Sequence, residues 1–335
     1  MIFTLISAAV VLGLLVIVHE LGHFAVAKAV GIKVQEFSVG MGPKIFQVKK
    51  GETDYSLRGV PIGGYVKMEG EDESSDDEGS FSNKPILSRI AVLIAGSFMN
   101  FLLAIIVLSG IFFAIGVVTT NIAAVEEGAP AYEAGIEAGD RIIAIDGERA
   151  RTASAVQNYI NLSEEEQVQV TLEREGETIE RTVGTAIDEE YNRRVIGVQF
   201  DVEQSLGAAV AGSFRETRTI VVEIFNFFGR IFSGEANVSE EVAGPVGIVS
   251  LVGDATRAGF INVALLTAFI SINLGIMNLL PIPALDGSRI LFLLLEAVRG
   301  KPIDPEKEGM VHLVGFGILI FLMLMVTYQD ILRLF

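Results

Sequence analysis

The sequence contains no cysteine and only three histidines among its 335 residues. The absence of cysteine excludes disulfide bonds and thiolate metal sites. Basic residues are a minority, since 25 lysines and arginines stand against 42 aspartates and glutamates, giving a formal net charge of -17. This balance argues against a nucleic-acid-binding protein, which needs a basic face. Half of the residues are hydrophobic, which predicts a membrane bundle with a small soluble domain.

Part of the acidic excess is concentrated in one loop, predicted at 69–80. Its sequence EGEDESSDDEG (69–79) contains seven acidic residues. Such a run is typical of a solvated, flexible loop, because its like charges repel one another and it lacks the apolar residues of a core. A regulatory or metal-buffering role is the alternative.

Four uncharged apolar runs are long enough to cross a bilayer, because about 20 helical residues span roughly 30 Å of hydrocarbon. They predict transmembrane helices at about 1–24, 90–118, 258–285 and 309–330. The first run lacks the basic start and the small-residue cleavage site of a signal peptide, so we expect a retained helix. The fold class is therefore a polytopic α-helical membrane protein.

Lysines and arginines predict its orientation, because cytoplasmic loops carry an excess of them. They concentrate between the first and second helices, which includes a β-rich loop at about 32–68, and in the connection at about 287–308. We expect these two connections to be cytoplasmic. Both termini and the middle connection then lie on the extracytoplasmic side, between the two parts of the membrane core at 1–118 and 258–335.

The middle connection has a soluble composition and alternates short strands with one helix. Its pattern G-x-P-A…AG-x-x-x-GD-x-I…I-x-G resembles the PDZ domains of bacterial proteases and predicts an inserted α+β PDZ-like domain at 119–202. PDZ domains bind peptide ends by adding a strand to a sheet edge, which RVIGVQF (194–200) could supply. A domain that only obstructs access is the alternative.

The segment 203–257 places apolar residues at helical spacing, but charges interrupt it too often for a membrane span. It predicts an amphipathic helix lying on the membrane surface. Packing of this helix against the soluble domain is the alternative.

The motif HELGH at 19–23 closes the first apolar run. H-E-x-x-H on a helix puts His19 and His23 on one face, where both imidazoles can reach one metal ion, and puts Glu20 beside them to act on a metal-bound water. An ionisable residue at membrane depth costs about 2.5–3.5 kcal/mol, so it should have a partner or a function. The alternative is an inert, hydrogen-bonded cluster at the helix end.

A hydrolytic zinc site takes three protein ligands and keeps a fourth position open. The best third ligand is Asp286 in NLLPIPALDGSR (278–289), since His312 belongs to no motif. The first and third helices both run toward the cytoplasm, so the topology brings Asp286 to the depth of His19 and His23. We therefore expect a Zn²⁺ site toward the cytoplasmic side.

These motifs carry a family resemblance along nearly the whole chain. HELGH, GGYVKM (63–68), the PDZ-like segment and N-L-G-x-x-N-L-L-P-I-P-A-L-D-G (273–287) resemble the bacterial site-2 proteases, the RseP-like intramembrane zinc metalloproteases. The resemblance implies His19, His23 and Asp286 as zinc ligands and Glu20 as the catalytic residue. The chain departs from that pattern at Ser288, where glycine is usual, and at Ser97, where proline is frequent.

A membrane-spanning substrate must be unwound before cleavage, because its helix hides every peptide carbonyl in hydrogen bonds. The segment 54–68 predicts strand and turn whose edge could pair with an extended substrate. The resemblance implies a membrane-associated β-loop there, with these substrate-binding residues: Gly63, Gly64, Tyr65 and Val66. An ordinary cytoplasmic hairpin is the alternative.

Two further pairs of residues in the third helix are candidates for substrate binding. Pro281 and Pro283 must break the helix just before Asp286, which leaves backbone carbonyls free. Asn273 and Asn278 could hydrogen-bond the unwound substrate, as family members imply. Helix packing, which membrane amides commonly provide, is the alternative for the two asparagines.

We therefore expect a zinc endopeptidase that cleaves single-span membrane proteins within or near their transmembrane segment in the lipid bilayer. The resemblance implies the bacterial cytoplasmic (inner) membrane, and substrates already trimmed by another protease, such as an anti-sigma factor, or signal-peptide remnants. A membrane zinc peptidase acting outside the bilayer is one alternative. The other is a non-catalytic scaffold or transporter bearing a PDZ-like domain.

Overall fold

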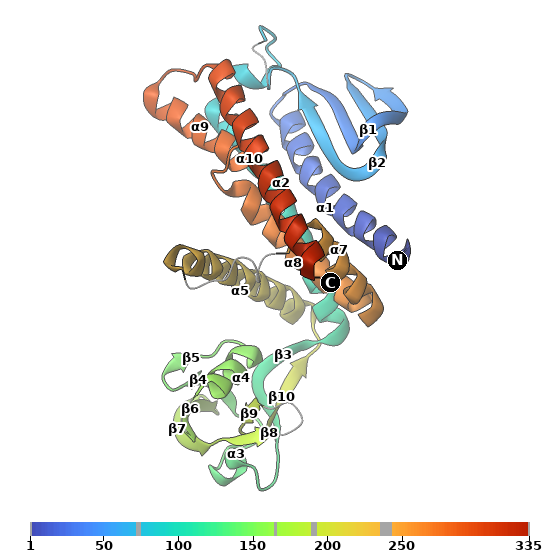
Figure 1. Cartoon of the computed structure of the whole chain (residues 1–335). Helices are drawn as coiled ribbons and strands as arrows, with labels where there is room; N and C mark the ends of the chain where they lie inside the picture. Colours follow the sequence, from blue (N-terminus) through green and yellow to red (C-terminus); the bar gives the residue numbers. More distant parts are fainter. Residues whose placement is uncertain (1, 72–74, 164–165, 189–192, 235–242, 334–335) are drawn as a thin grey trace. The chain divides into compact units, whose positions relative to one another are not determined.

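The computed structural model describes residues 2–71, 75–163, 166–188, 193–234 and 243–333 (Figure 1). Parts of the predicted acidic loop, PDZ-like domain and surface region lie outside the described residues. The chain forms two compact units, one of Met1–Ile111 with Ser213–Phe335 and one of Phe112–Gly212.

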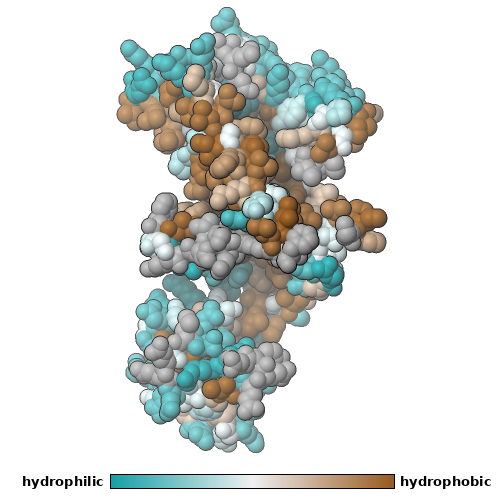
Figure 2. Space-filling model, viewed as in Figure 1, coloured by the Kyte–Doolittle hydropathy of each residue, from teal (hydrophilic) through white to brown (hydrophobic). Residues whose placement is uncertain are grey.

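Four helices of the described chain are long and apolar enough to cross a membrane. They are α1 (Ile2–Ala29), α2 (Ile86–Ile115), α8 (Phe260–Leu279) and α10 (Pro305–Arg333). Many of their large apolar side chains are exposed, as lipid-facing residues of a membrane helix would be. Figure 2 shows hydrophobic residues, in brown, gathered over the helices of the larger unit, whereas the visible face of the smaller unit is mostly teal.

Further elements complete the larger unit. They are β1 (Val34–Lys50), β2 (Thr53–Met68), η1 (Phe81–Asn83), most of α5 (Leu206–Ser233), α7 (Pro245–Ala258) and α9 (Asp286–Arg299). Helix α7 contacts α1, α8 and α10, and its Val252 is buried in one apolar cluster with Leu15 of α1. A second cluster joins α1, the hairpin, α2 and α9 through Ala27, Val34, Val92 and Leu293.

The hairpin of β1 and β2 has an unusual register, because β1 pairs on both of its sides. Residues 36–39 pair with 64–67 on one side and with 54–57 on the other. The segment 64–67 is therefore an outer strand of a small antiparallel sheet, and β2 also contacts α1.

The smaller unit is an α+β fold around an antiparallel sheet. Its main sheet has the order β10-β3-β4-β6-β7, with β5 paired to β4, and β8 pairs separately with β9. The strands and helices are β3 (Val117–Val125), α3 (Pro130–Glu133), β4 (Arg141–Ile145), β5 (Glu148–Arg149), α4 (Ala153–Leu162), β6 (Gln167–Arg174), β7 (Glu177–Gly184), β8 (Ala186–Asp188), β9 (Arg193–Val195) and β10 (Val198–Glu203). Ile142, Val156 and Leu172 are fully buried in its own core.

Candidate metal centre

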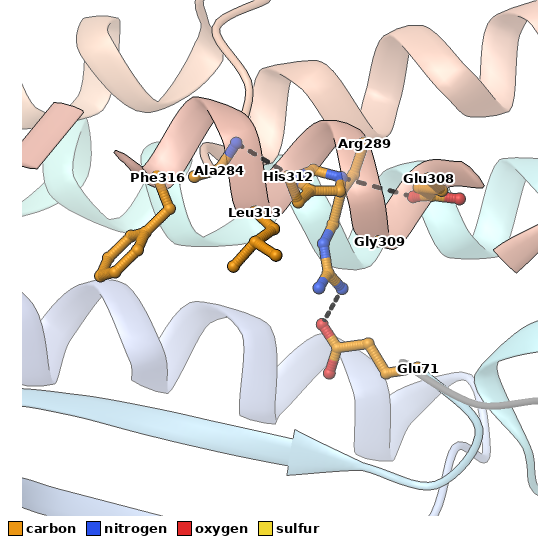
Figure 3. A pocket seen from close by; sticks show the side chains of 8 residues that line it. All are labelled: Glu71, Ala284, Arg289, Glu308, Gly309, His312, Leu313 and Phe316. Atoms are coloured by element: carbon orange, nitrogen blue, oxygen red, sulfur yellow. Dashed lines mark hydrogen bonds and ion pairs between the residues drawn. The ribbon is translucent and has the colours of Figure 1, made fainter. Parts of the chain in front are cut away.

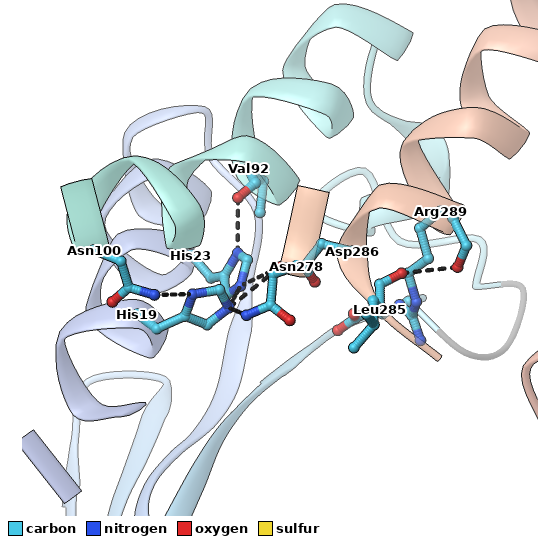
Figure 4. Close-up of polar contacts among 10 residues, drawn as sticks. His19, His23, Val92, Asn100, Asn278, Leu285, Asp286 and Arg289 are labelled. Atoms are coloured by element: carbon cyan, nitrogen blue, oxygen red, sulfur yellow. Dashed lines mark hydrogen bonds and ion pairs between the residues drawn. The ribbon is translucent and has the colours of Figure 1, made fainter. Parts of the chain in front are cut away.

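Helix α1 presents His19 and His23 on one face, because residues four apart in an α-helix lie one above the other. Both side chains are buried, and their Nε2 atoms lie 3.1 Å apart. Figure 4 shows the two imidazoles converging with Asn278 and Asp286 from the C-terminal part of the chain. The spacing of the two histidines in the sequence therefore accounts for two of the three candidate ligands.

Asp286 is the first residue of α9 and supplies the third side chain. Its Oδ2 lies 3.2 Å from His19 Nε2 and 3.4 Å from His23 Nε2. The candidate ligand atoms of these residues all lie within 4.8 Å of one another, the one such histidine and carboxylate group found in the described part of the chain. Three donor atoms at one point can hold a single metal ion and leave a position open.

The turn between α8 and α9 brings Asp286 to the histidines. Helix α8 ends at Leu279, and Pro281 and Pro283, which cannot donate backbone hydrogen bonds, occupy the turn that follows. Gly287 then lies against the backbone carbonyls of Leu279 and Leu280, where a Cβ atom would collide. This close approach lets α9 start directly beside the end of α8.

Helix α2 supplies hydrogen bonds behind both imidazoles. His23 Nδ1 donates to the Val92 carbonyl at 2.8 Å, so its Nε2 presents a lone pair toward Asp286. His19 Nδ1 lies 3.1 Å from the side-chain amide nitrogen of Asn100, a fully buried residue whose Oδ1 has no hydrogen-bond partner among the described residues. If the amide is turned so that Oδ1 faces His19, Oδ1 accepts a hydrogen bond from Nδ1–H. His19 Nε2 then carries a lone pair that can bind a metal ion, as His23 Nε2 does.

This donor set fits a metal ion. Asp286 Oδ2 is itself buried without a hydrogen bond within the described chain. Two imidazole lone pairs and a carboxylate oxygen facing one another repel unless a cation lies between them. The composition of two histidines and one aspartate matches the nitrogen and oxygen ligands that Zn²⁺ takes in hydrolytic sites.

Two glycines let α1 and α2 approach closely at the site. Gly22 packs against the Ala95 carbonyl, and a Cβ atom on Gly96 would lie 2.5 Å from His23 Nε2 and 2.6 Å from His19 Cε1. Only a residue without a side chain fits here. Gly96 and Asn100 were not predicted as site residues, although both lie in the segment AGSFMN (95–100), which differs from the family pattern at Ser97.

The hairpin reaches α1 next to Glu20. A Cβ atom on Gly64 would lie 3.5 Å from Glu20 Cγ and 3.7 Å from Val16 Cγ1. Gly63 has a positive φ of 89°, and the side chain of Val66 is buried. Tyr65 directs its hydroxyl toward Arg58, and the backbone N–H of Val66 donates to the Glu20 carboxylate. Gly64 and Val66 therefore bring the hairpin against Glu20.

The two asparagines of α8 differ in their positions. Asn278 Nδ2 lies 3.5 Å from His19 Nε2, beside the candidate ligands. Asn273 donates to the Phe269 carbonyl of its own helix at 3.0 Å. The structure therefore brings Asn278 to the metal centre and leaves Asn273 bonded to its own helix.

The chain belongs to Peptidase family M50, whose model matches residues 7–322. A Clostridium perfringens protein named as a zinc metalloprotease is 39% identical over 98% of both chains. Regulator of sigma-W protease RasP of Bacillus subtilis is 31% identical and zinc metalloprotease RasP of Bacillus licheniformis is 33% identical, each over 99% of both chains. The crystal structure of the PDZ domain of the SdrC-like protein of Listeria innocua is 23% identical, covers 25% of this chain and 96% of that one, and has a TM-score of 0.23.

These relationships confirm the predicted family, enzyme class and cofactor. The protein is a zinc metalloprotease, and zinc is its cofactor. Together with the four apolar helices, they also confirm a multi-pass membrane protein.

Proposed function

We propose that this protease cleaves single-span membrane proteins within or near their transmembrane segment. The observation that carries the proposal is the position of the metal centre. His19 and His23 lie inside an apolar helix long enough to cross a membrane, and a short turn connects Asp286 to a second such helix. A hydrolytic site assembled from membrane helices suits a peptide bond that is itself at membrane depth.

In this proposal His19, His23 and Asp286 hold the zinc ion. When bound, zinc supplies Lewis-acid chemistry, which polarises the scissile carbonyl and acidifies the attacking water. Glu20 accepts the proton of that water and returns it to the leaving amine as the peptide bond breaks. The Val92 carbonyl holds the proton on His23 Nδ1. The Asn100 amide, turned so that Oδ1 faces His19, would do the same for His19 Nδ1, so that each Nε2 stays available for the metal.

The outer strand of the hairpin is the proposed docking edge for the unwound substrate. Residues 64–67 pair with β1 on one side only, within the described residues, and Gly64 lies close to Glu20. An extended substrate can add to such an edge through backbone hydrogen bonds. Asn278 lies beside His19 and can donate a hydrogen bond to a substrate carbonyl. Such a carbonyl needs a new donor once the substrate helix unwinds. We propose supporting roles for Gly63, Tyr65, Val66, Asn273, Pro281 and Pro283 in shaping this site.

The proposed substrates are membrane proteins already trimmed by another protease, such as anti-sigma factors, and signal-peptide remnants. The likeness to a protein named regulator of sigma-W protease supports this class. The basic residues around 28–89 and 289–307 support a cytoplasmic position for these segments. Both termini and the PDZ-like domain at 119–202 then lie on the extracytoplasmic side of the membrane. On that side, the domain and α5 can screen out untrimmed substrates.

The test compares wild type with Glu20→Gln, using a tagged single-span substrate in proteoliposomes and zinc analysis of both proteins. We expect the variant to retain zinc and to lose cleavage, because the removed group handles a proton and does not hold the metal. Mapping of the wild-type cut should place it within or near the transmembrane segment. Full activity of the variant, or cuts confined to sequence far outside the membrane, would overturn the proposal.

A further inference from the structure

Among the described residues, one backbone N–H of the turn that carries Asp286 donates to a different helix, α10. The N–H donors of this turn, between the end of α8 and the start of α9, belong to Leu280, Ile282, Ala284 and Leu285. Leu280 donates back to the Met277 carbonyl of α8 at 3.1 Å. Ile282 donates to the Leu280 carbonyl at 2.7 Å, and Leu285 donates to the Ile282 carbonyl at 3.1 Å. Ala284 instead donates to Nδ1 of His312 on α10, at 3.0 Å.

Ala284 also has an uncommon backbone conformation. Its φ is 75°, in the left-handed region that favours glycine. A non-glycine residue persists there only when its surroundings determine the conformation. The hydrogen bond from Ala284 to His312 is one such determinant, and it acts two residues before Asp286.

Helix α10 also contacts the turn one helical turn further on. The backbone of α10 at Gly315 lies so close to Pro283 that a Cβ atom there would be 2.9 Å from both the Pro283 carbonyl carbon and its oxygen. His312 and Gly315 are three residues apart and therefore share a helical face. The turn is thus held by a steric contact at Pro283 and by a hydrogen bond at Ala284.

The surroundings of His312 fit its role as an acceptor. Figure 3 shows its imidazole between Ala284 and Glu308. His312 Nε2 lies 3.6 Å from Glu308 Oε1, and the ring stacks edge-on against Phe292 of α9 at a centroid distance of 5.8 Å. A carboxylate on the Nε2 side favours the tautomer with Nε2 protonated, which leaves Nδ1 as the acceptor that Ala284 requires.

We infer that His312 is a positioning residue for Asp286, which rests on the proposed role of Asp286 as a zinc ligand. The imidazole holds Ala284 in its left-handed conformation and thereby fixes where α9 begins. Without His312, the Ala284 N–H loses the acceptor that fixes its direction. The turn would then relax and carry the carboxylate of Asp286 away from His19 and His23.

The experiment measures zinc affinity of the full-length protein in detergent, by competition with a chelator, for His312→Leu and His312→Asn. Asparagine places an oxygen near the position of Nδ1 and can accept from Ala284, whereas leucine cannot. We expect His312→Leu to weaken zinc binding by about 10- to 100-fold, as loss of an outer-shell partner does. We expect His312→Asn to stay close to wild type in zinc affinity and in substrate cleavage.

Three further variants keep the result interpretable. Gly315→Ala introduces a clash with Pro283, next to the hydrogen bond at Ala284, and should also weaken zinc binding, even if His312→Leu does not fold. Leu324→Ala is the matched control on α10, since Leu324 is 59% exposed, and it should bind zinc as wild type does. Asp286→Ala tests the underlying ligand set.

The outcomes separate the two proposals. If Asp286→Ala leaves zinc affinity unchanged, the proposed ligand set is wrong. If Asp286→Ala abolishes binding while folded His312→Leu binds zinc as tightly as wild type, the proposed ligand set holds and the role of His312 is overturned. If His312→Leu does not fold, wild-type zinc affinity of Gly315→Ala overturns the positioning of Asp286 by α10. Equal weakening by His312→Leu and His312→Asn would also contradict the acceptor role.

Discussion

Asp286 Oδ2 lies 3.2 Å from His19 Nε2, although the two residues come from helices α9 and α1 near opposite ends of the chain. The contact joins the two parts of the membrane core that the smaller unit separates in sequence. Any disturbance of α1, α2 or the turn before α9 should therefore appear as a change in zinc affinity.

Asn100→Leu should weaken zinc binding by about 10- to 100-fold, because His19 loses the side-chain amide, whose Oδ1, when turned toward Nδ1, keeps that nitrogen protonated. Asn100→Asp retains an acceptor oxygen and should bind zinc more tightly than the leucine variant. Chelator competition measures both, and thermal unfolding of the zinc-free proteins shows whether the fold is intact. Equal zinc affinity of Asn100→Leu and wild type would contradict this role for Asn100.

Gly96→Ala should disrupt the metal centre, because the added methyl group would lie 2.5 Å from His23 Nε2. The imidazole has little freedom to move, since its other nitrogen is bonded to the Val92 carbonyl. Gly110→Ala is a control on the same helix, where an added Cβ meets nothing within 4 Å. Zinc content after purification should fall for Gly96→Ala and remain at the wild-type level for Gly110→Ala.

The hairpin should lose stability at acidic pH through Glu36. Partial burial raises the pKa of Glu36, but hydrogen bonds from Ser56 and Arg58 outweigh it and lower this pKa to about 2. The unfolded value is about 4.3, so the stabilisation is fully present above that pH and is lost as the pH falls toward 2.

Hydrogen exchange of the β1 and β2 amides, corrected for intrinsic rates, measures this effect. Protection in wild type should decline as the pH falls below about 4.3. Glu36→Gln removes the titrating group, so its protection should be lower at neutral pH and should change less with acidification. An identical pH dependence in both proteins would exclude Glu36 as the cause.

Much of the membrane core could be predicted from the sequence, because its signals are local. Long uncharged runs indicate the four helices, and the spacing of His19 and His23 places both on one helical face. Asp286 was predicted from topology, because α1 and α8 run in the same direction. Each of these inferences needs only periodicity, charge and chain direction.

Other parts of the site have no local sequence signal. Asn100 is 81 residues from His19 in sequence, so their contact depends on how α1 and α2 cross. The left-handed conformation of Ala284 could not be predicted from the sequence either, because alanine does not indicate a positive φ as glycine does. Helix α7 lies within the predicted surface region, yet Val252 packs against α1, a tertiary contact that amphipathicity alone does not specify.

The most direct test of the account is the zinc stoichiometry and affinity of Asp286→Ala beside wild type and Glu20→Gln, all as full-length protein. We predict one tightly bound zinc ion in wild type and in Glu20→Gln, and severe loss of zinc from Asp286→Ala, because a ligand from the C-terminal part of the core is gone. Wild-type zinc binding by Asp286→Ala would contradict the claim that both parts of the membrane core hold the metal together.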